Sequence, residues 1–317
     1  MSGPVGTTDA PPAVADCSHP SAPCVEVTDS RDEQVGKVRV RRALPRKGRR
    51  TVGAWCFADH MGPADVTENS GLDVGPHPHI GLQTVTWLID GQVLHRDSLG
   101  SEQVIKPGQL NLMTSGGAVS HAEEATGQYR GTLEGIQLWV ALPEATRHGA
   151  AAFEHHADLP QGELDGAVAT VLVGDFGDLT SPARHDTPLV GVDLDLHSPT
   201  TVPLHPDWEY AVVVLEGAVG VDTKPLPPGK LGYLGRGRDE LHLDVREPTR
   251  AVLLGGEPFE EPIVMWWNFV GRTREEIDAA YASWARQDDR FGRVHSSLPL
   301  IPAKAPYWHQ EQSRGRQ

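Results

Sequence analysis

Two pairs of potential metal ligands are the most chemically suggestive feature of the sequence. His77 and His79 flank a single residue in GPHPHIGLQTVTWLIDG, and His121 and Glu123 have the same spacing in SGGAVSHAEEA. Residues i and i+2 of an extended strand point to the same side, so each pair presents both side chains on one face. Three imidazoles and one carboxylate suit Fe(II), Mn(II), Ni(II), Cu(II) or Zn(II). If a barrel brings the pairs together, they predict a site for one divalent metal, with positions left for water, dioxygen or a substrate oxygen.

The spacing of the two pairs alone does not distinguish a metal site from a chance arrangement. The chain contains 15 histidines, so pairs separated by one residue also arise by chance. We interpret the adjacent His155 and His156 as residues without a chemical role. The second of the two ligand pairs follows a glycine-rich turn, Ser115 to Gly117, and this context favours a defined strand and hence a site.

The segments that carry these residues are typical of an all-β protein. Glycine and proline contribute 34 and 26 of the 317 residues, about a fifth of the chain against an ordinary share of roughly 12%. Short runs with alternating apolar and polar residues are separated by turn residues. TVTWLID and QVLHRD, on either side of Asp90 and Gly91, predict a β-hairpin. VIKPGQLNLMT predicts a second strand pair that turns at Pro107 and Gly108.

The strand-like segments fall into two halves with a similar rhythm. WLIDGQV in the first half and VLEGAVG in the second lie roughly 120 residues apart, which indicates a duplicated domain. Thr273 and Glu276 form a capping box before apolar residues at helical spacing, so Arg272 to Gln287 is predicted to be a helix. We therefore expect a disordered tail over residues 1–24, an N-terminal metal-binding domain over 25–145, a C-terminal domain without metal over 146–262, and a helix and tail over 263–317.

The second half carries only remnants of a ligand set. His205 stands alone in HPDWEY, and His242 is not part of an H-x-E pair. We interpret both as ordinary core or rim residues. The expected stoichiometry is therefore one metal per chain, bound in the N-terminal half.

Composition narrows the classes of function. A formal net charge of −15 disfavours general nucleic-acid binding. A run of about 18 uncharged apolar residues, which a membrane span needs, is absent from the sequence. The N-terminus lacks the charged start and apolar run of a signal peptide, and three cysteines do not make a disulfide framework, so we expect a cytoplasmic protein.

One basic run, Lys37 to Arg50, contrasts with this acidity and holds eight basic residues among fourteen. It is either a phosphate-binding arm or a strand whose arginines lie on a solvated face and are balanced by neighbouring carboxylates. It also leaves open a contact with an acidic protein partner.

Several segments resemble the pirin family. They are the stretch from Val38 to Met61, HPHIGLQTVTWLIDGQVLHRDSLGS, PGQLNLMTSGGAVSHAEE and the late GEPFEEPIVMWWNFVGRTREEI. The resemblance extends from residue 25 to about residue 290. It implies a bicupin, in which two cupin (jelly-roll) barrels face each other and only the N-terminal one holds a metal, usually iron. The ligand positions of the family match His77, His79, His121 and Glu123.

The resemblance also implies a function. Bacterial pirins are associated with quercetin 2,3-dioxygenase activity, in which dioxygen attacks an activated flavonol enolate and carbon monoxide is lost. The mammalian member is associated with transcriptional co-regulation, so a redox-sensitive, iron-binding regulatory protein is the alternative. A third hypothesis is that the metal pocket takes another small oxygen-rich metabolite.

One position departs from the family pattern. Many pirins and cupins carry Glu four residues after the second histidine, where this chain has Gln83. By strand parity Gln83 shares a face with His77 and His79, so we expect it to border the metal as a neutral hydrogen-bonding group. Glu123 is then the expected catalytic base as well as a ligand.

Overall fold

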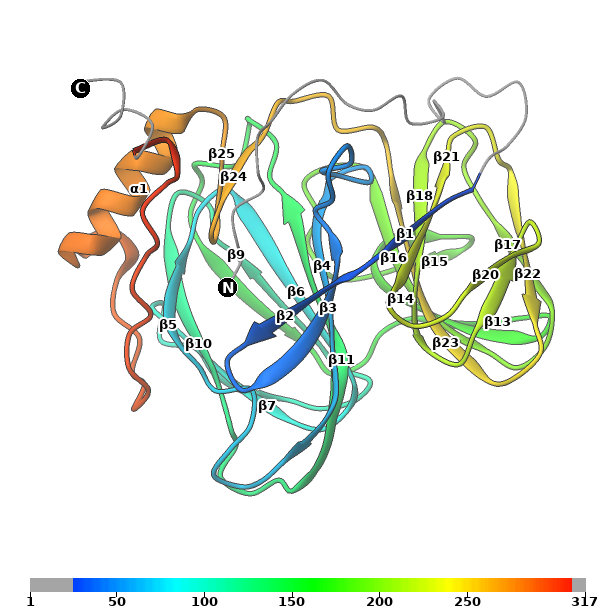
Figure 1. The fold of residues 1–317 in the computed structure, drawn as a ribbon, viewed down its shortest axis with the longest axis horizontal. Helices are drawn as coiled ribbons and strands as arrows, with labels where there is room; N and C mark the ends of the chain where they lie inside the picture. The colour runs from blue at the N-terminus through cyan, green and yellow to red at the C-terminus, as the bar shows by residue number, and fades with distance from the viewer. Residues whose placement is uncertain (1–24, 310–317) are drawn as a thin grey trace.

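The structure, a computed structural model, describes residues 25–309 and consists mainly of β-strands. Two β-barrels lie side by side, and the one α-helix of the described residues lies on the outer flank of the N-terminal barrel (Figure 1). The predicted all-β fold with a C-terminal helix is confirmed. The tail expected over residues 1–24 lies outside the described residues.

The N-terminal barrel is formed by a seven-stranded and a four-stranded antiparallel sheet. In spatial order, the larger sheet contains β12 (Ala152–His156), β9 (Leu110–Thr114), β6 (Leu82–Asp90), β11 (Gly131–Ala141), β4 (Trp55–Val66), β3 (Val38–Leu44) and β2 (Arg31–Val35). The smaller sheet contains β5 (Val74–His79), β10 (Val119–Glu124), β7 (Val93–Asp97) and β8 (Glu102–Ile105). The predicted ligands all lie on β5 and β10, which are neighbours in the smaller sheet.

Two strand pairings expected from the sequence are wrong. β6 pairs with β9 and β11, whereas β7 pairs with β8 and β10, so the chain passes from one sheet to the other at Gly91, where φ is +94°. β8 and β9 likewise belong to different sheets, on either side of Pro107 and Gly108. The alternation of apolar residues shows which side chains face inward, but packing between distant strands selects the partner.

The C-terminal barrel also has a larger and a smaller antiparallel sheet. The eight strands of the larger sheet are β1 (Glu26–Asp29), β21 (Lys230–Gly235), β18 (Glu209–Glu216), β23 (Thr249–Gly256), β16 (Leu189–Leu196), β14 (Ala167–Phe176), β13 (Gln161–Leu164) and β15 (Leu179–Thr180). The smaller sheet contains β17 (Thr200–Pro203), β22 (Glu240–Val245), β19 (Val219–Val221) and β20 (Lys224–Leu226). β1 joins this barrel and β12 joins the other, so strands cross over between the barrels. The domain boundaries at residues 145 and 262 stay a prediction.

The larger sheets of the two barrels pack against each other through a shared apolar core. Leu138 from the first barrel and Val213 and Leu254 from the second belong to one buried cluster. Trp55, fully buried in this cluster, donates from Nε1 to the carbonyl oxygens of Val190 and Gly255, each at 3.1 Å. The barrels are therefore joined by a core and not by a mobile linker.

The interior of the C-terminal barrel is filled with aliphatic side chains, among them Val171, Val192 and Leu253. His205 and His242 are both exposed, and His242 pairs with Glu240 at 3.0 Å. Neither belongs to a group of potential metal ligands among residues 25–309, and the absence of metal from this barrel stays a prediction.

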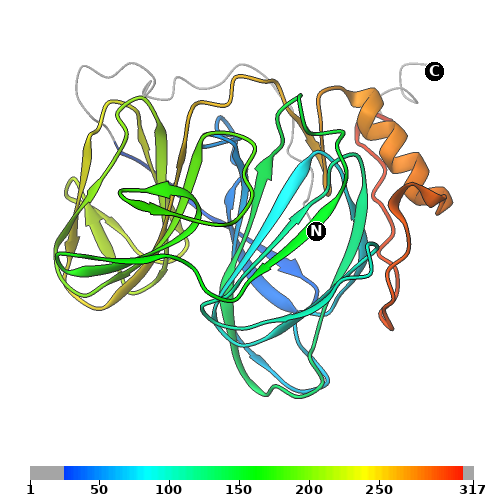
Figure 2. The same ribbon diagram turned by 180° about the vertical axis from the view of Figure 1, so that it is seen from behind.

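The C-terminal segment returns to the N-terminal barrel. It comprises β24 (Val264–Trp266), β25 (Phe269–Gly271), α1 (Arg274–Arg286) and a short 3₁₀ helix, η1 (Asp289–Phe291). The Thr273 hydroxyl caps α1 by accepting from the backbone N–H of Glu276 at 3.2 Å, as the sequence predicts. The apolar face of the helix packs with Ile80, which follows β5, and Figure 2 shows the same placement from behind.

The chain beyond the helix lies directly over β5. The backbone N–H of Ile301 donates to the carbonyl of Pro76 at 2.9 Å, and the Ile301 carbonyl accepts from Nε1 of Trp284 at 2.8 Å. A Cβ atom on Gly75 would lie 2.0 Å from the carbonyl oxygen of Pro299, so this close approach requires glycine. The strand that carries two predicted ligands is therefore held from outside by the segment around Pro299 and Ile301.

Candidate metal centre

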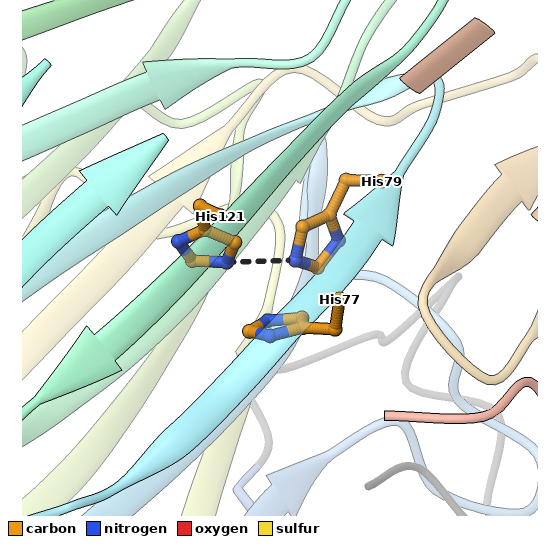
Figure 3. A group of neighbouring side chains, drawn as sticks. All are labelled: His77, His79 and His121. Atoms are coloured by element: carbon orange, nitrogen blue, oxygen red, sulfur yellow. Dashed lines mark hydrogen bonds between the residues drawn. The ribbon is translucent and has the colours of Figure 1, made fainter. Parts of the chain in front are cut away.

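Three of the four predicted ligands meet in the interior of the N-terminal barrel. β5 and β10 run antiparallel, with His121 opposite His77 and Val119 opposite His79. One ring nitrogen from each histidine lies within 4.8 Å of the others, and all three side chains are buried. Figure 3 shows the rings converging from the two strands.

The outward-facing nitrogens of the two β5 histidines are fixed by backbone carbonyls. Nδ1 of His77 lies 2.9 Å from the carbonyl oxygen of Gly75, and Nδ1 of His79 lies 3.1 Å from that of Asn268. Because a carbonyl only accepts hydrogen bonds, each Nδ1 carries the proton and each Nε2 keeps a free electron pair. Both rings are thus held in the tautomer that binds a metal through Nε2.

The electrostatics of the cluster favour neutral rings. Burial lowers the pKa of His77 to about 4 and places the pKa values of His79 and His121 well below the ordinary 6.5. Nε2 of His79 lies only 3.0 Å from Nε2 of His121. If both nitrogens are unprotonated, their electron pairs repel each other unless a cation lies beside them. Three neutral, converging imidazoles are donors that suit a divalent metal ion, so the residues present are chemically suited to hold one.

Glu123 lies beside the three histidines in the same cavity but is not part of the group of converging ligand atoms. The pairing of β10 with β5 shifts register between His121 and Glu123, which places Glu123 opposite Val74. Burial raises the pKa of the Glu123 carboxyl group to about 7. The position of Glu123 is compatible with a fourth ligand or a proton acceptor, and both roles stay predictions.

The cavity next to the cluster measures about 50 Å³, room for a few water molecules. Most of its wall is apolar. The aromatic rings of Phe57 and Trp139 stack at 4.0 Å, and Ile301 contributes from the C-terminal segment. The other apolar side chains that line the cavity are Val35, Val40, Met61, Leu72 and Val74.

A buried ion pair that the sequence did not indicate also lines the cavity. Arg42 on β3 donates from Nε and Nη2 to the carboxylate of Asp59 on β4, at 2.7 and 2.6 Å, and both residues are almost fully buried. The two side chains are cross-strand neighbours separated by 17 residues of sequence, so only the strand pairing reveals them. Gln137, which lies on β11 opposite Asp59, extends this polar part of the wall.

This pair also clarifies the basic run from Lys37 to Arg50. In addition to Arg42, Arg39 pairs with Asp32 at 2.7 Å and Arg49 with Glu26 at 3.0 Å. Carboxylates of neighbouring strands balance these arginines, which supports the interpretation as a strand over that as a phosphate-binding arm.

The expectation that Gln83 borders the metal is wrong. Gly81, with φ of +68°, separates β5 from β6, so strand parity does not extend from His79 to Gln83. Nε2 of Gln83 donates to Oγ1 of Thr114 at 3.0 Å and to the carbonyl of Arg184 at 3.3 Å. Gln83 thus faces the neighbouring strand and the chain of the second barrel, and it does not line the histidine cavity.

The family comparison agrees with this architecture. Residues 37–140 match the family model described as "Pirin", and residues 189–292 match "Pirin C-terminal cupin domain". The chain belongs to the pirin family. The bicupin fold predicted from the sequence is thereby confirmed.

Related proteins share almost the whole length of the chain. A Pseudomonas aeruginosa protein named "Putative quercetin 2,3-dioxygenase PA1205" is 46% identical over 286 residues, 88% of this chain and 90% of the relative. A Caulobacter vibrioides "Pirin-like protein" is 36% identical over 81% of this chain and 92% of its own length. A crystal structure of quercetin 2,3-dioxygenase from Acinetobacter baumannii superimposes with a TM-score of 0.86 at 43% identity, covering 89% of this chain and 95% of that one.

Within residues 25–309, no helix has the length and apolar composition that a membrane span needs.

Proposed function

We propose that this chain is an iron-dependent dioxygenase of the quercetin 2,3-dioxygenase type. The observation that carries the proposal is the buried convergence of three neutral imidazoles on one cavity. The names of the Pseudomonas and Acinetobacter relatives support the activity, and iron is the proposed metal because it is redox-active and suits this donor set. The proposed ligands are His77, His79, His121 and Glu123.

A divalent ion bound there would lower the pKa of a phenol or enol hydroxyl that approaches it. A base near the metal is then needed to accept the hydroxyl proton. Two carboxylates line the cavity, but the Asp59 carboxylate is engaged on both oxygens by Arg42. We therefore assign proton transfer to Glu123, which lies next to His121 on the same face of β10.

The remaining wall suits a flat, oxygen-bearing substrate. Phe57 and Trp139 form an aromatic surface, and the ring of Trp139 also meets His79 edge-on at 5.2 Å. A planar ring that packs on this surface would have one edge at the histidines. At the other edge the Gln137 amide NH₂ would donate a hydrogen bond to a substrate oxygen, because Oε1 of Gln137 already accepts from Thr86 at 2.8 Å.

The cavity volume favours a second candidate substrate class. A space of about 50 Å³ takes a small enolisable metabolite directly, whereas a three-ring flavonol requires side chains of the wall to move. Ile301 belongs to the terminal segment that covers β5, so it is the wall residue best placed to shift.

One experiment tests the activity with both classes. The metal-free protein is loaded with Fe(II) under nitrogen, and oxygen uptake is followed after quercetin or a small enolisable dicarbonyl compound is supplied. The proposal predicts uptake coupled to loss of one of these compounds, and no uptake by the His77→Ala variant. Binding of one iron per chain without uptake on either compound would contradict the enzyme proposal and leave a regulatory role.

A further inference from the structure

A second buried histidine and carboxylate stand behind the metal centre. Nδ1 of His95 lies 3.4 Å from Nδ1 of His121, and Nε2 of His95 lies 3.1 Å from Oδ2 of Asp97. β7 pairs with β10 so that Asp97 is opposite His121 and His95 is opposite Glu123. His95 and Asp97 are 5% and 3% exposed, so water does not compete for these contacts.

The protons along this chain of contacts can be assigned in order. The Asp97 carboxylate only accepts, so Nε2 of His95 carries a proton and donates it to Oδ2. Nδ1 of His95 then has a free electron pair and accepts from Nδ1–H of His121. Nε2 of His121 is left unprotonated and faces His79 Nε2 across the cluster.

His121 differs in this respect from the other two ligands. His77 and His79 are fixed by backbone carbonyls, which are acceptors under all conditions. The Nδ1 atom of His121 meets another imidazole, which can donate or accept. The tautomer of His121 is therefore set only if something fixes the tautomer of His95.

The surroundings of His95 are suited to this task. Oδ1 of Asp97 accepts from the backbone N–H groups of Leu99 and Ser101, each at 2.9 Å, which holds the carboxylate in place. The imidazole of His95 stacks on the ring of Phe153 from β12 at 4.3 Å, with 11° between the planes. These contacts constrain both the position and the tautomer of His95.

We propose that His95 is a positioning residue of the metal centre, which together with Asp97 holds His121 in the tautomer that binds metal through Nε2. This inference rests on the proposed metal centre and adds two residues to it. Hydrogen-bond partners of ligand histidines typically contribute 10- to 100-fold in metal affinity.

Two substitutions separate this role from simple packing. His95→Phe keeps a ring that can stack on Phe153 but removes the acceptor for His121. Asp97→Asn keeps an oxygen for the two backbone donors and turns an amide NH₂ toward His95. The His95 proton then moves to Nδ1, where it opposes Nδ1–H of His121, so the ligand has to change tautomer or rotate.

Two further variants complete the set. His95→Asn is the rescue variant, because its amide oxygen takes roughly the place of the Nδ1 acceptor. His155→Phe is the matched control, since His155 lies on β12 of the same barrel and its Nδ1 contacts Oδ1 of Asn111 at 2.7 Å.

The measurement is a Co(II) titration of metal-free protein, with the ligand N–H protons followed by NMR in the Co(II)-loaded form. We expect His95→Phe and Asp97→Asn each to lose 10- to 100-fold in affinity, and the double variant to lose no more than the weaker-binding single one. The His121 N–H resonance should be lost or exchange rapidly with water in His95→Phe. His95→Asn should regain part of the affinity, and His155→Phe should bind as the unmodified protein does.

Unchanged Co(II) affinity in His95→Phe and Asp97→Asn would overturn the inference. An equal loss in His155→Phe, or losses that match a fall in the thermal stability of the metal-free variants, would show general disturbance of the barrel and also overturn it. A separate result tests the underlying site: equal Co(II) binding by the unmodified protein and His77→Ala would refute the metal centre itself.

Discussion

The buried ion pair between Arg42 and Asp59 should contribute strongly to the stability of the fold, and an exposed Arg–Asp pair in the same barrel provides a control. Asp59→Asn keeps the size of the side chain but removes its charge, and it leaves the Arg42 guanidinium buried without its carboxylate. Arg39 and Asp32 form a pair of the same chemistry at the barrel surface, where their side chains are 73% and 58% exposed. Asp32→Asn is therefore the matched control.

The two substitutions should lower the free energy of unfolding by amounts that differ several-fold. Removal of one partner of a buried pair typically costs about 3–5 kcal/mol, because the remaining charge stays desolvated. An exposed pair typically contributes about 0.2–1 kcal/mol, because water screens it and the long side chains lose entropy in forming it. We expect the free energy of unfolding to fall by about 3–5 kcal/mol in Asp59→Asn and by less than about 1 kcal/mol in Asp32→Asn.

Urea denaturation of the metal-free proteins, followed by tryptophan fluorescence, measures both values. Metal-free protein is used so that lost metal binding does not add to the difference. Losses of similar size in the two variants would refute the reasoning, since they would show that burial does not set the energetic role of the inner pair.

Three further predictions follow from individual residues. Glu123→Gln should lower oxygen uptake per bound metal by about 10²–10⁴-fold, because an amide does not accept the substrate proton, and equal rates per metal would contradict the base role. Burial raises the pKa of the Cys56 thiol to about 12, so iodoacetamide at pH 8 should modify it only after denaturation, as peptide mass spectrometry will show. The double variant His205→Ala/His242→Ala should keep one metal per chain by elemental analysis, whereas a loss of metal would show a site in the second barrel.

Sequence patterns predicted the local features of this fold and failed where distant segments meet. The helix was predictable because Thr273 and Glu276 are near neighbours and cap it through local bonds. The Asp90 and Gly91 turn was correctly located, but its strands pair elsewhere because jelly-roll packing overrides the hairpin. Strand parity failed for Gln83, since Gly81 redirects the backbone and parity holds only within an unbroken strand.

The same distinction applies to the metal centre. His77, His79 and His121 were found because pairs with one intervening residue present both side chains on one face of a strand. The carbonyl of Asn268 carries no side-chain signal, yet it sets the tautomer of His79 from 189 residues away. His95 was visible in the sequence only as part of a family motif, since its contact with His121 depends on the pairing of β7 with β10.

We infer that the three converging histidines bind one metal ion per chain. Anomalous diffraction from crystals of the iron-loaded protein, collected on both sides of the iron absorption edge, tests it most directly. We expect one anomalous peak per chain, roughly 2 Å from Nε2 of His77, His79 and His121, with an oxygen of Glu123 as the fourth protein ligand. The inferred site would be contradicted by a metal bound through Nδ1 of these histidines, by a peak in the second barrel, or by the absence of a peak in fully loaded crystals.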